Sequence, residues 1–157
     1  MKTLIFYASK YGCTADCAAY LQTKLENATL VDVEKAPAQM DLSGFDTIII
    51  GGSVYVSKVS KKLRAFCESN IDTLLKKRVG IFLCCALPEQ FNEVLTANFP
   101  AALLNSSVVT KTFGSEARLA MMKFFDKMII KAVSKGDFSK FQISYESMDE
   151  FVREIGG

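Results

Sequence analysis

The chain alternates between short apolar runs and longer segments in which apolar residues recur every three or four positions. Short apolar runs bounded by polar residues or glycine are typical of strands, and the wider spacing is typical of helices. The run at 47–50 is β-branched and wholly apolar, so we expect cover on both of its faces, as in a parallel sheet. The predicted strands are Lys2–Ala8, Thr29–Val33, Thr47–Ile50, Val79–Cys85 and, nearer an edge, Ser107–Phe113.

The segments between these strands have apolar residues at the spacing of helices. Thr14 is expected to cap the first helix, which Asn27 closes, and Ser60 to cap another. The remaining helices are predicted as a short turn at 71–75, then Glu89–Asn98, Ala117–Ser134 and, after a short extended piece at Phe141–Ser144, Ser147–Ile155. Strands interleaved with helices imply right-handed crossovers. We therefore predict one doubly wound α/β sandwich over residues 1–157, a five-stranded parallel sheet with helices on both faces.

Composition and charge then narrow the class of protein. A length of 157 residues suits a single domain, and a net charge of +2 argues against a nucleic-acid partner. Five cysteines are an odd number, which argues for a reducing compartment. No secretory leader or bilayer-spanning run is evident. We therefore expect a cytoplasmic location.

The chain has no histidine, which excludes nucleophilic triads and any zinc site that uses histidine. Without Cys-x-x-Cys pairs, an all-thiolate metal site is not expected either. Cys13 and Cys17 lie four residues apart on one predicted helix. They are interpreted either as a redox pair or as ordinary buried cysteines. Cys84 and Cys85 point to opposite faces of a strand and are not expected to pair. No catalytic side chain is identified, so a cofactor is expected to supply any chemistry.

Three loops follow the carboxyl ends of the predicted inner strands, where ligands bind in such folds. They are Ser9–Thr14, Ser53–Lys58 and Cys85–Gln90. In the first loop, Ser9, Tyr11 and Thr14 supply hydroxyls and Gly12 permits a tight turn. The first amides of the next helix point toward the same spot, which makes this loop a candidate phosphate cradle.

Missing motifs discriminate among the phosphate-bearing ligands that this architecture binds. The triphosphate motif Gly-x-x-x-x-Gly-Lys-Ser/Thr and the dinucleotide motif Gly-x-Gly-x-x-Gly are both absent after the first strand. A phosphate-accepting receiver domain needs acidic residues where this chain has Ala8, Ser9 and Ser53. Flavin mononucleotide (FMN) remains.

The segment Ser9-Lys10-Tyr11-Gly12-Cys13-Thr14 resembles the Thr/Ser-x-Thr-Gly-x-Thr phosphate loop of the flavodoxin family. It matches at the first hydroxyl, the glycine and the last threonine, and departs at Tyr11 and Cys13. The resemblance covers almost the whole chain and implies that the predicted sandwich is flavodoxin-like. It implies that Ser9, Gly12, Cys13 and Thr14 hold the FMN phosphate, with Lys10 and Tyr11 completing the loop.

A narrower resemblance concerns Ile50–Tyr55, the helix entry at Lys58–Phe66 and the segment Phe124–Lys131, which are similar to the branch containing flavodoxin-type protoporphyrinogen oxidases. It implies that Ser53, Val54 and Tyr55 line the isoalloxazine ring. Cys85, Ala86 and Leu87 would follow the other edge, and Tyr55 is the stacking candidate. Relatives commonly have glycine where Ser57 stands, and flavodoxins stabilise half-reduced flavin by flipping a peptide in this loop. A serine makes the positive φ costlier, which argues against strong stabilisation of half-reduced flavin here. Flavodoxins are also acidic, unlike this chain.

Lysines recur every fourth residue in the long late helix, at Lys123, Lys127, Lys131 and Lys135. They indicate either a helix packed on the sheet with solvated lysines or peripheral contact with an anionic membrane surface or redox partner.

The leading hypothesis is a noncovalent FMN electron carrier that serves a redox partner protein or a membrane quinone-linked chain. The alternatives are an FMN-dependent oxidoreductase of the protoporphyrinogen oxidase type, with a tetrapyrrole substrate, and a flavin-free interaction module.

Overall fold

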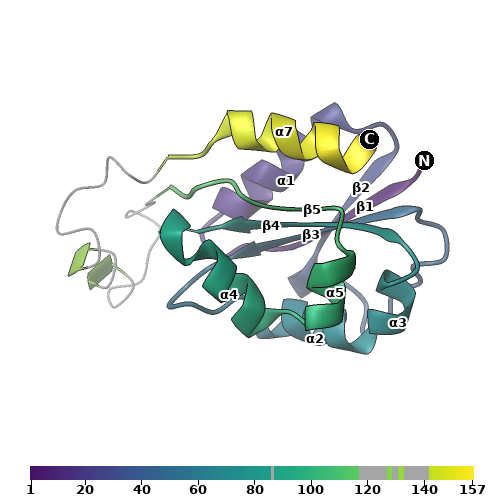
Figure 1. Cartoon of the computed structure of the whole chain (residues 1–157), viewed down its shortest axis with the longest axis horizontal. Coiled ribbons are helices and arrows are strands. Elements are labelled where there is room, and N and C mark those ends of the chain that lie inside the picture. Colours follow the sequence, from purple (N-terminus) through teal and green to yellow (C-terminus); the bar gives the residue numbers. More distant parts are fainter. Residues whose placement is uncertain (86, 117–126, 129–130, 133–141) are drawn as a thin grey trace.

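A five-stranded parallel sheet forms the centre of the computed structural model, which describes residues 1–85, 87–116, 127–128, 131–132 and 142–157. The strand order is β2-β1-β3-β4-β5, and every neighbouring pair is parallel. The predicted fold class is therefore confirmed (Figure 1). The strands are β1 (Thr3–Ala8), β2 (Ala28–Asp32), β3 (Thr47–Ser53), β4 (Arg78–Cys84) and β5 (Val109–Thr112).

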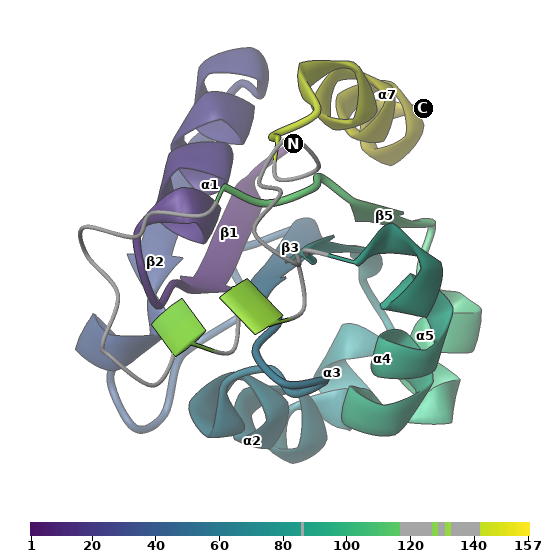
Figure 2. The same ribbon diagram turned by 90° about the vertical axis from the view of Figure 1, so that its left-hand side faces the viewer.

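Helices cover both faces of this sheet, as Figures 1 and 2 show. On one face lie α1 (Cys13–Lys24) and α7 (Tyr145–Gly156). On the other face lie α2 (Lys61–Ser69), α3 (Ile71–Leu74), α4 (Phe91–Asn98) and α5 (Ala101–Ser106). Two short 3-10 turns, η1 (Val33–Lys35) and η2 (Pro88–Gln90), complete the described elements.

The two faces have different cores. Aliphatic residues dominate under α2–α5, where Ile48, Ile50 and Leu63 are fully buried. Under α1 and α7, the ring of Phe82 stacks on Phe113 with centroids 4.6 Å apart, and Phe151 of α7 meets both rings edge-on. A methyl group at Gly51 would come within 2.1 Å of the Phe82 ring, so glycine in β3 leaves the room that this aromatic group occupies.

Some local predictions differ from the structure. Thr14 does not cap α1; Gly12 stands at the N-cap with φ 92°, and Thr14 lies inside the first turn. Helix α5, which follows Pro100, was not predicted. Strand β3 runs three residues further than predicted, to Ser53, because Gly51 and Gly52 still pair with β1 and β4.

Ser60 caps α2 as predicted, since its Oγ accepts a hydrogen bond from the Leu63 amide. The last strand, β5, lies at the sheet edge, as predicted, and Gly114 follows it with φ 75°. Of the extended piece expected at Phe141–Ser144, Ile143 forms a bridge with Gly114. The predicted helix Ala117–Ser134, with its lysine repeat and the Phe124–Lys131 segment, lies outside the described residues apart from 127–128 and 131–132, as do Ala86 and Phe141.

Candidate functional site

The three loops named from the sequence meet at one edge of the sheet. β1, β3 and β4 are adjacent and parallel, so their carboxyl ends at Ala8, Ser53 and Cys84 lie side by side. Figure 2 faces this edge. Ligands in open α/β folds bind outside the carboxyl ends of the strands, so this edge is the candidate site.

Hydroxyl groups hold the first loop, Ser9–Thr14, in its turn. The Ser9 Oγ accepts hydrogen bonds from the amides of Gly12 at 3.1 Å and Ala15 at 3.3 Å. It thereby performs the role that we expected of Thr14. The positive φ of Gly12 is one that residues with a side chain adopt only at a cost. Helix α1 therefore begins directly after this turn, and the positive, N-terminal end of its dipole faces the candidate site.

Thr14 connects the first loop to the second. Its side chain is fully buried, and its Oγ1 shares a hydrogen bond of 2.6 Å with Ser53 Oγ. Ser53 is the last residue of β3, so this bond joins two loops that are 39 residues apart in the sequence. The structure thus brings together two residues that the sequence assigned separately to the phosphate and to the ring.

The second loop has an unusual backbone. Val56 and Ser57 both have positive φ, of 49° and 61°, in a turn closed by hydrogen bonds between the backbones of Tyr55 and Lys58. A β-branched residue such as Val56 in this region is a conformational outlier. Ser57 therefore adopts the positive φ that we expected a serine to disfavour.

The side chain of Asn98 in α4 stabilises the second loop through hydrogen bonds, a role that the sequence analysis did not predict. Its Oδ1 accepts a hydrogen bond from the Val59 amide at 3.1 Å, and its Nδ2 donates to the Ser57 carbonyl at 2.9 Å. The same Nδ2 donates to the Val94 carbonyl at 2.8 Å. Asn98 is 7% exposed, so its amide is committed to these three partners. An asparagine at the end of an apolar helical face is the only sequence signal of this role.

The third loop begins at Cys85, whose buried thiol donates to the Leu87 carbonyl at 3.2 Å. Burial raises the pKa of the Cys85 thiol. The Val54 amide donates to the Cys84 carbonyl at 3.0 Å, which joins the second loop to the end of β4, directly before the third loop.

A cavity of about 530 Å³ opens between the first and second loops, within the range of small-molecule sites. Of the predicted site residues Ser9, Lys10, Ser53 and Tyr55 line it, as does Lys58 of the second loop. The Lys10 ammonium lies 3.6 Å from the centre of the Tyr55 ring and bridges the two loops. The described residues that line this cavity do not include Tyr11, Gly12, Cys13, Thr14, Val54, Cys85 or Leu87.

The strand order and the three loops define a doubly wound α/β domain with a hydroxyl-bearing loop, Ser9–Thr14, at the point where the strand order reverses. The model of the flavodoxin domain family matches residues 4–143, and the chain belongs to that family. The search of curated proteins gave no match. Within the described residues, no helix is both long and apolar enough to cross a bilayer.

Solved flavodoxin structures share the fold. The flavodoxin of Streptococcus pneumoniae TIGR4 is 14% identical, covers 99% of this chain and 98% of its own, and has a TM-score of 0.63. Oxidised flavodoxin 1 from Bacillus cereus is 16% identical over 99% of this chain and 95% of its own, with a TM-score of 0.56. A flavoprotein from Lactobacillus acidophilus NCFM, solved in complex with FMN, is 15% identical, covers 71% of this chain and 92% of its own, and has a TM-score of 0.53.

Proposed function

We propose that this chain binds FMN noncovalently and carries electrons between redox partner proteins. The observation that carries the proposal is the first loop, in which Ser9 and Gly12 shape the turn and Thr14 joins it to Ser53. Membership of the flavodoxin family supports the choice of flavin. When bound, FMN supplies reversible one- and two-electron transfer, which the side chains of this protein do not.

The residues at the edge suit the chemical parts of this cofactor. A dianionic phosphate fits the amino end of α1, where Ser9, Gly12, Cys13 and Thr14 would hold it and Lys10 adds positive charge. Tyr55 offers a flat side chain for the ring. Val54 would follow the same edge of the ring as Tyr55, and Cys85, Ala86 and Leu87 the opposite one.

Titration of the flavin-free protein with FMN tests the phosphate loop directly, with riboflavin as the matched control. Riboflavin has the same ring but no phosphate. We expect FMN to bind much more tightly than riboflavin, because only FMN engages the charged loop. Equal affinities would contradict the phosphate assignment. Failure of both ligands to bind would favour the flavin-free interaction module.

An FMN-dependent oxidoreductase is the second candidate, and the protoporphyrinogen oxidase branch is its most specific form. The cavity of about 530 Å³ beside Tyr55, Val56 and Val59 favours it, since an apolar substrate would need such space. Against it, the chain has no histidine, and the cavity-lining carboxylate Glu34 is ion-paired with Lys62 at 2.6 Å. Neither feature offers a ready proton acceptor.

Anaerobic incubation of the FMN-loaded protein with a reduced tetrapyrrole and a quinone distinguishes the candidates. A carrier is expected to accept electrons from a flavodoxin reductase and to leave the tetrapyrrole unchanged. Catalytic oxidation of the tetrapyrrole, with transfer to the quinone, would establish the enzyme and a route to a membrane quinone-linked chain.

A further inference from the structure

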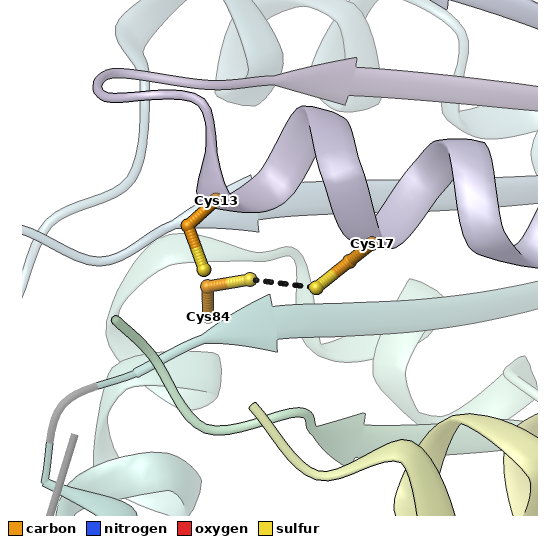
Figure 3. Close-up of side chains that lie close together, drawn as sticks. All are labelled: Cys13, Cys17 and Cys84. Carbon is orange, nitrogen blue, oxygen red and sulfur yellow. Dashed lines mark hydrogen bonds between the residues drawn. The ribbon is translucent and has the colours of Figure 1, made fainter. Parts of the chain in front are cut away.

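Three cysteines converge beneath the first loop. Cys13 and Cys17 lie one helical turn apart on α1, and Cys84 ends β4 (Figure 3). The three Sγ atoms lie within 4.8 Å of one another, and those of Cys17 and Cys84 are 3.8 Å apart. All three residues are thiols. The spacing 13, 17, 84 has no motif, so the cluster comes from the packing of α1 on the sheet.

Apolar side chains bury all three thiols. Their exposed fractions are 6% for Cys13, 1% for Cys17 and 2% for Cys84, and they belong to the apolar core that includes Ile5, Leu21 and Phe82. Hydrogen bonds with the neighbouring thiols, followed by burial, raise the pKa of Cys17, and a hydrogen bond with Cys13 is the main cause of the raised pKa of Cys84. At neutral pH Cys17 and Cys84 are therefore protonated.

Charge and ligand number limit what such a cluster can bind. Thiolate sulfur selects soft ions. Three thiolates around a monovalent ion carry a net charge of −2 and around a divalent ion −1, and an uncompensated charge in an apolar core is costly. Zinc also prefers four ligands, and in the described part of the chain the cysteine cluster contains no fourth histidine, cysteine or carboxylate. A trivalent ion with three sulfur ligands is neutral.

We propose that Cys13, Cys17 and Cys84 form a binding site for a trivalent thiophilic ion, with arsenic(III) as the type case. Neutral arsenous acid, As(OH)3, exchanges its three hydroxyls for three sulfurs. Three As–O and three S–H bonds break, three As–S and three O–H bonds form, and the thiol protons leave with the hydroxyls as three water molecules. Arsenic stays in oxidation state +3 and no electrons are transferred. The product is uncharged, so it suits the apolar core, and Cys13, the most exposed of the three, provides the point of entry.

Native mass spectrometry of the full chain with sodium arsenite, in a thiol-free reductant, tests the site. The expected species carries one arsenic atom and has lost three hydrogens. A two-sulfur adduct differs, because it retains one hydroxyl on arsenic and has lost only two hydrogens. X-ray absorption at the arsenic edge should show three sulfur neighbours.

Cysteine variants locate the binding. Cys13→Ala, Cys17→Ala and Cys84→Ala should each abolish the three-hydrogen adduct. Cys67→Ala and Cys85→Ala remove buried thiols outside the cluster and should leave the adduct intact. Circular dichroism checks that each variant folds. The hydrogen count of the wild-type protein stands even where a variant unfolds.

Several results would overturn the proposal. They are failure of the wild-type protein to bind arsenite, a three-hydrogen adduct that persists without any one of Cys13, Cys17 and Cys84, and binding of Zn(II) or Cu(I) in preference to arsenite under the same conditions. The readout does not require FMN, so it stands apart from the proposed electron-transfer function.

Discussion

The loops after β1 and β3 lie at the same edge of the sheet but are stabilised in different ways. The first places glycine, Gly12, at its positive φ, and its hydrogen bonds to Ser9 are local. The second places Val56 and Ser57 at positive φ and is held by Asn98, which is 41 residues away from Ser57. The first conformation is therefore encoded within the loop, whereas the second is imposed by tertiary contacts. Strain of this kind concentrates at functional sites.

The largest expected effect comes from removing the distant support. Asn98→Ala removes the side-chain partner of the Val59 amide and of the Ser57 carbonyl. We expect the free energy of unfolding to fall by roughly 3 kcal/mol, since each unsatisfied buried group costs about 1–3 kcal/mol. Urea denaturation measures it, with the exposed Asn92→Ala in the same helix as control. Equal stability of the two variants would mean that the second loop supports itself.

Thr14→Ala tests whether the first loop serves the phosphate. We expect FMN affinity to weaken by about 1–3 kcal/mol, because a charged ligand would lose one hydrogen-bond partner. Quenching of FMN fluorescence on binding measures the change. Thr23→Ala, on the exposed side of α1, is the control. Unchanged affinity in Thr14→Ala would locate the phosphate elsewhere.

Gly12→Ala tests the local encoding of the first loop. At a φ of 92°, a Cβ is expected to cost about 1–2 kcal/mol of unfolding free energy. Gly44→Ala is the matched control, since nothing lies within 4 Å of a methyl group there. A loss no larger than that of the control would show that the turn relaxes without strain.

The smallest effect should be a gain in the second loop. Ser57→Gly relieves the left-handed strain but adds freedom to the unfolded chain, so a net stabilisation of about 0.5–1 kcal/mol is expected. Ser57→Ala keeps the strain and should bring no gain. Thermal unfolding measures both variants. Destabilisation by glycine would mean that the Ser57 side chain itself supports the turn.

Features that depend on neighbouring residues could be predicted from the sequence, whereas features that depend on contacts between distant segments could not. The presence of five strands, the Ser60 cap and the edge position of β5 depend on local pattern and chain order, and these were predicted correctly, although β3 runs three residues further than predicted. The cap of α1 was assigned to Thr14 because position alone does not reveal that Ser9 Oγ reaches two amides of the turn. Asn98 and the meeting of Cys84 with α1 depend on packing between distant segments, which no local pattern encodes. The assignment of the loops to parts of the flavin stays a prediction.

The position of α7 has a consequence for how the chain acquires its structure. Phe151 of α7 covers Phe82 in β4 and Phe113 beyond β5, and Arg78 at the start of β4 donates to the carbonyls of Glu154 and Ile155. During synthesis, α7 leaves the ribosome after every strand that it covers. The sides of Phe82 and Phe113 that Phe151 covers therefore lack this cover until α7 emerges. Nascent chains that end before α7 expose this hydrophobic surface, so aggregation competes with folding at that stage.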